Sequence, residues 1–125
     1  MKTKTLLQAI VLFLIVTKLY SQDLAGQWNG SLQIQGKPLR IVFHVTKINN
    51  EYKATLDSPD QNAAGLLVTT TSFHYPNVKF EITDLGMVYE GSMSSEGITG
   101  KWLQSGTAFF LSLVKNTDIL QKAIK

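Results

Sequence analysis

Few residues of this 125-residue chain have the types and spacing that catalysis or metal binding requires. The chain has two histidines, His44 and His74, and neither has a carboxylate at a spacing that suggests a metal site or an acid–base pair. The acidic residues are scattered singly, and the Gly-x-Ser-x-Gly pentapeptide of a serine-hydrolase elbow does not occur. The absence of cysteine excludes thiolate metal ligands and thiol redox chemistry. We therefore expect a non-enzymatic protein with no cofactor and no metal.

The most distinctive polar stretch runs from Asp57 to Gly65 and is longer than a tight hairpin needs. Its residues Ser58, Asp60 and Gln61 are candidates for binding a ligand or partner, because such loops carry function more often than strands do. The alternative is a purely conformational role. Short polar side chains bond to neighbouring backbone groups, and the proline and glycine of the stretch fix its bends.

Aromatic residues are the other candidates for binding a ligand or partner: Trp28, Phe43, Tyr89 and Trp102. Ligand pockets favour aromatic linings with few polar groups. Trp28 and Trp102 have similar neighbours near the start and the end of the β-rich region, and a closed barrel would bring these two regions together. Packing in the core is the first interpretation of these rings, and ligand binding is the second. Truncating a buried ring to alanine costs about 3–5 kcal/mol.

The first 21 residues have the layout of a secretory signal peptide. Lys2 and Lys4 precede an apolar run from Ala9 to Val16, and Ser21 supplies a small residue for cleavage directly after it. The apolar run is about half of the roughly 20 residues that a membrane-spanning helix needs. We therefore expect a periplasmic or secreted product with no stable membrane anchor. The alternative, a buried N-terminal helix, finds no helical partner later in the chain.

Loss of this segment also changes the charge of the chain. Lys2, Lys4 and Lys18 leave with it, so the formal net charge falls from +3 to zero. A neutral mature chain offers no charged surface that would attract nucleic acid or acidic membranes. We therefore expect neither of them as a partner.

Residues 22–115 show short segments of period-two alternation separated by turn residues, the pattern of an all-β meander. In one of them Leu39, Ile41 and Phe43 alternate with polar or exposed neighbours. Short connections force neighbouring strands to be antiparallel. The pattern predicts eight strands, at residues 27–34, 39–46, 52–57, 66–75, 78–82, 87–93, 98–103 and 108–114.

An open sheet of this size would expose two long edges, and closure into a barrel removes both. We therefore predict an all-β domain, an eight-stranded antiparallel up-and-down barrel, over residues 22–115. A barrel of eight strands is filled by its own side chains or holds one small ligand, and the bulky inward residues favour a filled or narrow lumen. Residues 116–125 show helical spacing of apolar side chains, which predicts a short C-terminal helix, with a frayed tail as the alternative.

A resemblance extends over nearly all of this region. The residues that carry it are Trp28-Asn29-Gly30, Leu39 to Val45, Ala54 to Gln61, Tyr89-Glu90-Gly91 and Ile98 to Trp102, with Asp-Ser-Pro-Asp-Gln as the most specific stretch. Together they resemble the small N-terminal β-domain of exported Bacteroidota α/β-hydrolases of the serine esterase or peptidase type. The resemblance implies an extracytoplasmic, lipocalin-like barrel of the calycin class. The hydrolase domain that follows in those proteins has no counterpart in this sequence, so no catalytic residue is carried over.

Different classes of function follow from these observations. The first is a non-catalytic binding or accessory module that holds a small apolar ligand or a protein partner. The second is an accessory domain or subunit of an exported α/β-hydrolase encoded elsewhere. A purely structural role is the third.

Overall fold

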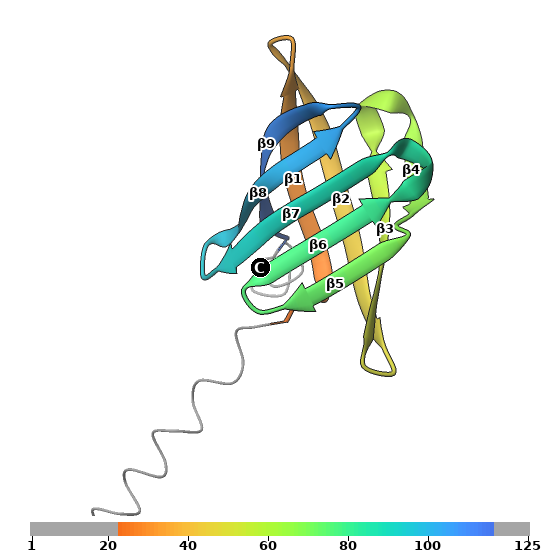
Figure 1. The fold of residues 1–125 in the computed structure, drawn as a ribbon, viewed down its shortest axis with the longest axis vertical. Coiled ribbons are helices and arrows are strands. Elements are labelled where there is room, and N and C mark those ends of the chain that lie inside the picture. The colour runs from red at the N-terminus through yellow and green to blue at the C-terminus, as the bar shows by residue number, and fades with distance from the viewer. Residues whose placement is uncertain (1–22, 117–125) are drawn as a thin grey trace, which may run out of the picture.

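The computed structural model describes residues 23–116, which form one curled antiparallel sheet of nine strands (Figure 1). The predicted signal peptide at 1–21 and, apart from Asn116, the predicted C-terminal helix lie outside the described residues. The strands are β1 (Gly26–Ile34), β2 (Lys37–Ile48), β3 (Glu51–Ser58), β4 (Ala63–Leu67), β5 (Thr70–His74), β6 (Asn77–Ile82), β7 (Met87–Ser94), β8 (Gly97–Gln104) and β9 (Thr107–Lys115).

The strands are hydrogen-bonded in the order β4-β3-β2-β1-β9-β8-β7-β6-β5, and every ladder is antiparallel. Figure 1 shows β5 to β8 crossing in front of β1 to β3, so the sheet curls into a half-barrel. Pairing of β1 with β9 joins the start and end of the described chain, with Trp28 opposite Lys115. The all-β antiparallel prediction is therefore confirmed. Within residues 23–116, no helix is long and apolar enough to cross a bilayer.

The predicted number of strands was wrong, because the segment expected as one strand at 66–75 forms two. The Val68 N–H donates to the Ala54 carbonyl of β3 at 3.1 Å, whereas the next N–H, from Thr69, donates to the Glu81 carbonyl of β6 at 2.7 Å. The chain therefore changes its partner strand between Val68 and Thr69. Polar and apolar residues alternate only weakly in this segment. This is consistent with its first half pairing with β3 and its second half pairing with β6.

The interior of the half-barrel is filled by a cluster of aromatic and aliphatic side chains. Phe43 lies at its centre and stacks on Phe80, with ring centroids 4.2 Å apart. The rings of Tyr89 and Trp102 approach Phe43 to 6.2 Å and 6.4 Å. The buried members are Leu24, Trp28, Leu32, Ile41, Phe43, Val45, Ala54, Leu56, Val78, Phe80, Ile82, Met87, Tyr89, Met93, Ile98, Trp102, Leu111 and Leu113.

The polar atoms on the core rings have hydrogen-bond partners: those of Tyr89 and Trp28 bond to the main chain, and the indole N–H of Trp102 donates to Gln104 Oε1 at 3.0 Å. The hydroxyl of Tyr89 donates to the Leu111 carbonyl at 2.8 Å, and burial raises the pKa of that hydroxyl. The indole N–H of Trp28 donates to the carbonyl of Leu24 at 2.8 Å, and Leu24 itself is fully buried at one end of the half-barrel. Buried polar groups are stable only when paired in this way. The rings are therefore held as core.

Candidate functional site

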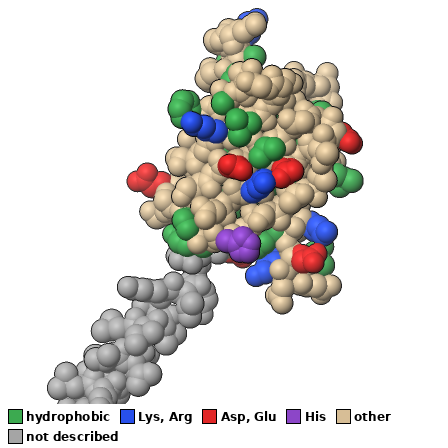
Figure 2. Space-filling model, in the orientation of Figure 1, with side chains coloured by type: hydrophobic (Ala, Val, Ile, Leu, Met, Phe, Trp, Pro, Cys, Tyr) green, Lys and Arg blue, Asp and Glu red, His purple; other side chains and the backbone are tan. Residues whose placement is uncertain are grey.

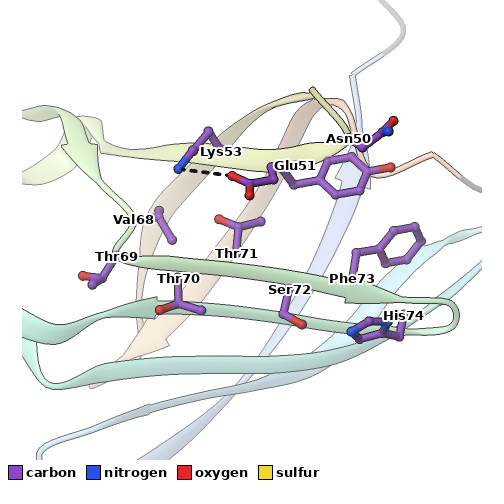
Figure 3. A pocket seen from close by; sticks show the side chains of 11 residues that line it. Asn50, Glu51, Lys53, Val68, Thr69, Thr70, Thr71, Ser72, Phe73 and His74 are labelled. Atoms are coloured by element: carbon purple, nitrogen blue, oxygen red, sulfur yellow. Dashed lines mark ion pairs between the residues drawn. The ribbon is translucent and has the colours of Figure 1, made fainter. Parts of the chain in front are cut away.

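A cleft of about 470 Å³ lies along the seam between β3 and β5 (Figure 3). The cleft is lined by Asn50–Lys53 on one wall and by Val68–His74 on the other. β3 is paired with β4 only in its second half, from Thr55 onward. In the described part of the chain, no ladder joins the first half of β3 to β5. The seam is thus open where the cleft lies.

On β3, the main-chain groups point alternately toward β2 and toward the seam. A two-residue turn joins Ile48 to Glu51, and a pair that flanks such a turn is hydrogen-bonded. Because hydrogen-bonded positions recur at every second residue, Glu51 faces β2 and Tyr52 faces the seam. The bond from the Val68 N–H to the Ala54 carbonyl follows the same alternation. Tyr52 therefore presents its N–H and C=O to the cleft.

The same alternation applies on β5. A two-residue turn joins His74 to Asn77, so His74 and Ser72 bond to β6. Thr71 and Phe73 then present their N–H and C=O groups to the seam. Among the ladders of residues 23–116, none uses the main-chain donors and acceptors that border the cleft on its two sides.

The side chains of the cleft are mostly polar. Thr71 points from β5 toward β3 in Figure 3, and its buried Oγ1 has no hydrogen-bond partner among residues 23–116. Glu51 and Lys53 form an exposed ion pair on the opposite rim, with Oε2 and Nζ 3.9 Å apart. The rings of Tyr52 and Phe73 meet edge to face, with their centroids 5.8 Å apart. The lining thus combines unused hydrogen-bonding groups with a balanced pair of charges.

Replacing Thr71 by valine is expected to leave the free protein as stable or to stabilise it by about 1 kcal/mol. An unpartnered buried hydroxyl costs about 1–3 kcal/mol, and valine keeps its shape. Urea unfolding of the two proteins checks this. A loss of stability above about 1 kcal/mol would show that Oγ1 makes a bond in the free protein.

The four aromatic candidates from the sequence lie in the core and not at the seam. Phe43 and Tyr89 are fully buried, and Trp28 and Trp102 are almost so. Trp28 also borders a second cleft, beside the turn between β7 and β8, where the Lys115 ammonium lies 5.7 Å from the centre of its ring.

The polar candidates from the loop make contacts within the chain. The Ser58 hydroxyl is buried and donates to Gln61 Oε1 at 3.0 Å. Asp60 accepts hydrogen bonds from the main-chain N–H of Arg40 and from its guanidinium, both at 2.8 Å. The carboxylate of Asp57 accepts the N–H of Gly65 at 2.7 Å. The contacts of Asp60 with Arg40 fasten the turn between β3 and β4 to β2, and the other two lie within the segment itself.

One pairing was missed from the sequence. His44 Nε2 lies 2.7 Å from Asp57 Oδ2, because β2 and β3 place Val42 opposite Asp57 and so bring His44 diagonally next to it. The pair is partly exposed on the outer face of the sheet. Within residues 23–116, no cluster of three or more His, Cys, Asp or Glu side chains has metal-binding geometry.

Acid is expected to destabilise the fold through this loop. The Gly65 N–H, and then His44, lower the pKa of Asp57, and the Arg40 guanidinium lowers the pKa of Asp60. A carboxyl whose pKa is lower in the folded state stabilises it above the unfolded value of about 3.9 and loses that contribution as the pH falls through the folded value. Urea unfolding should therefore show stability falling below about pH 4. The double variant D57N/D60N should be less stable at neutral pH and should show a flatter decline; an unchanged slope would contradict the assignment.

The comparisons with protein families, with curated proteins and with solved structures find nothing that matches this chain, so the assignment of function depends on the seam and the core as described.

Proposed function

We propose that this chain is an exported, non-catalytic binding module whose ligand site is the seam cleft between β3 and β5. The observation that supports it is that the main-chain groups of Tyr52, Thr71 and Phe73 on the cleft side take part in no ladder of the described residues and border a cleft of about 470 Å³. Buried or half-buried N–H and C=O groups are nearly always paired in folded proteins. A ligand that pairs them would complete the sheet.

The filled interior argues against a ligand inside the half-barrel. A small apolar ligand would have to displace rings such as Phe43 and Phe80, which stack at 4.2 Å and are fully buried. Removing a buried phenylalanine side chain from such a core costs about 3–5 kcal/mol. Of the two ligand classes that the sequence suggested, we therefore favour a protein partner over a small apolar molecule.

Over the described residues, the face shown in Figure 2 has no patch of single-sign charge that would indicate a binding surface other than the seam cleft. Acidic and basic side chains are interspersed on that face. On β6, Lys79 and Glu81 form such a mixed pair, with Nζ and Oε1 2.9 Å apart. A surface with mixed charges lacks the single-sign field that steers a highly charged partner. This favours recognition through hydrogen bonds at the seam.

For the partner, we propose an exported α/β-hydrolase encoded elsewhere, the class that the sequence resemblance implies. In that role this chain would bind the hydrolase and supply none of its catalytic residues. The support is the likeness of the Asp57–Gln61 stretch and of the tryptophan-containing strands to the β-domain of such enzymes. Co-purification with a hydrolase encoded beside this chain would support this partner. If the purified hydrolase bound this chain at a surface away from the seam, the proposed site would be contradicted.

The site is tested by a fragment screen on ¹⁵N-labelled protein comprising residues 22–125. We expect the amide shifts caused by polar fragments to concentrate at residues 50–53 and 68–74. A dansyl-labelled fatty acid serves as the probe for the interior, and we expect it to leave the core amides unshifted. Fragment shifts confined to other surfaces, or saturable shifts of the core amides with the fatty acid, would overturn the proposed site.

A further inference from the structure

We propose that the occupant of the seam cleft is an extended peptide segment of the partner, which adds as a strand to the free edge of β5. This inference rests on the proposed function and names the ligand class of that site. Its basis is the juxtaposition of two strand edges that face each other and are not paired.

The main-chain groups of the cleft match those of an added strand. Thr71 and Phe73 are two residues apart on β5, which is the spacing at which a neighbouring strand exchanges hydrogen bonds. Tyr52 offers the same groups from β3 across the cleft. Backbone pairing supplies affinity in strand addition, and side chains at alternate positions supply specificity.

The edge of β5 is also unprotected. Natural sheets usually guard a free edge with lysine, proline or an inward-pointing charge. β5 is Thr-Thr-Ser-Phe-His and carries none of these within its bounds. The lining from Val68 to His74 is seven residues long, so a segment of about five to seven residues would lie along it at roughly 3.3 Å per residue.

Charge complementarity predicts the pattern of the peptide. Because every neighbouring pair in the sheet is antiparallel, β5 runs opposite to β3, and a strand antiparallel to β5 runs parallel to β3. Such a strand passes Glu51 first and Lys53 second, and both side chains are exposed on the rim. Opposite charges on neighbouring strands attract, so the peptide should carry a basic residue followed two positions later by an acidic one. The position between them faces inward, where a threonine can bond to the free Oγ1 of Thr71.

The probe is the blocked peptide acetyl-Thr-Val-Lys-Thr-Glu-Val-Thr-amide, titrated into ¹⁵N-labelled protein comprising residues 22–125. We expect the largest amide shifts at Tyr52, Thr71 and Phe73. The matched peptide with its lysine and glutamate exchanged should bind on the order of fivefold more weakly, since each exposed pair contributes about 0.2–1 kcal/mol. A third peptide, N-methylated at alternate amides, should lose binding if the main chain makes the contacts.

The charge-swapped protein E51K/K53E provides the matched control. It keeps the net charge, and both side chains are exposed, so the fold should be unaffected. We expect this variant to prefer the exchanged peptide over the original. Equal binding of both peptides by both proteins, or unchanged binding of the N-methylated peptide, would overturn strand addition.

The result separates this inference from the function it rests on. If polar fragments shift residues 50–53 and 68–74 but no peptide does, the occupant is not a strand, and the seam remains the ligand site. If neither fragments nor peptides shift these residues, both proposals fail.

Discussion

Replacing Phe43 by alanine is expected to lower the free energy of unfolding by about 3–5 kcal/mol. The Phe43 ring is fully buried, stacks on Phe80 at 4.2 Å and lies within 6.4 Å of Tyr89 and Trp102. Its loss removes apolar burial and leaves a cavity that three other rings border. Because small domains are stable by only about 5–15 kcal/mol, this is a large part of the total. Equilibrium unfolding in urea measures it.

Phe110 provides the matched control, because it is the same residue type on the outside of the sheet and is 82% exposed. Its ring contacts the Lys101 ammonium at 5.5 Å, and alanine there should change stability by no more than about 0.5 kcal/mol. Similar losses for the two variants would mean that the interior is not packed around Phe43. The argument against an internal ligand would then fail as well.

Replacing Gly100 by alanine is expected to lower the free energy of unfolding by about 3 kcal/mol, the upper end of the cost of overpacking. A Cβ at this position would collide with the carbonyl oxygen of Glu90 and would lie 2.6 Å from the Cα of Gly91, its partner on β7. Both obstacles are backbone atoms, so no side chain can rotate to relieve the contact. The close approach of β7 and β8 at this point depends on glycine.

A substitution at Gly106 is the control for G100A, because it replaces a glycine at a position where a Cβ meets no other atom within 4 Å. Gly106 has φ of +77°. Asparagine tolerates this left-handed conformation, so G106N should cost no more than about 1 kcal/mol. Thermal unfolding of the two variants side by side makes the comparison. If G100A is as stable as G106N, then β7 and β8 do not approach each other as described.

Alternation along the chain predicts most of the sheet because one face of each strand is buried. In β2 the buried residues Ile41, Phe43 and Val45 are separated by less buried ones, and this matches the period-two pattern of the sequence. Turn residues such as Asn49-Asn50 mark the hairpins correctly. The all-β class and the antiparallel connections follow from these local signals.

The seam could not be predicted in the same way. It depends on a change of partner strand between Val68 and Thr69, and both partners lie far from this segment along the chain, so local periodicity does not indicate it. Closure of a barrel was expected because it removes exposed edges. The curled sheet leaves part of that edge open between β3 and β5. The weak alternation at 66–75 is the sequence signal of this irregularity, although its β-branched residues predict a single strand.

The candidate residues also divide into those that the sequence indicates and those that only the structure reveals. The structure places the four aromatic candidates in the core, but aromatic type alone does not decide burial, since Phe110 and Tyr75 are exposed. Ser58 and Gln61 bond to each other through their side chains, and Asp60 bonds to Arg40 on β2, a partner that the local pattern of the loop does not indicate. Tyr52, Thr71 and Phe73 carry no motif. Their proposed role rests on main-chain groups that no ladder of residues 23–116 uses, and side-chain types do not reveal such groups.

Amide hydrogen exchange of the free protein, measured residue by residue by NMR, tests the central claim most directly. If the seam is open, the amides of Tyr52, Thr71 and Phe73 should exchange at least about an order of magnitude faster than those of Lys53 and Ser72, which bond to β2 and β6. This alternation of fast and slow residues along both strands is the predicted result. Uniform protection of residues 70–74 would contradict it, because β3 and β5 would then be paired and the half-barrel would have no open seam.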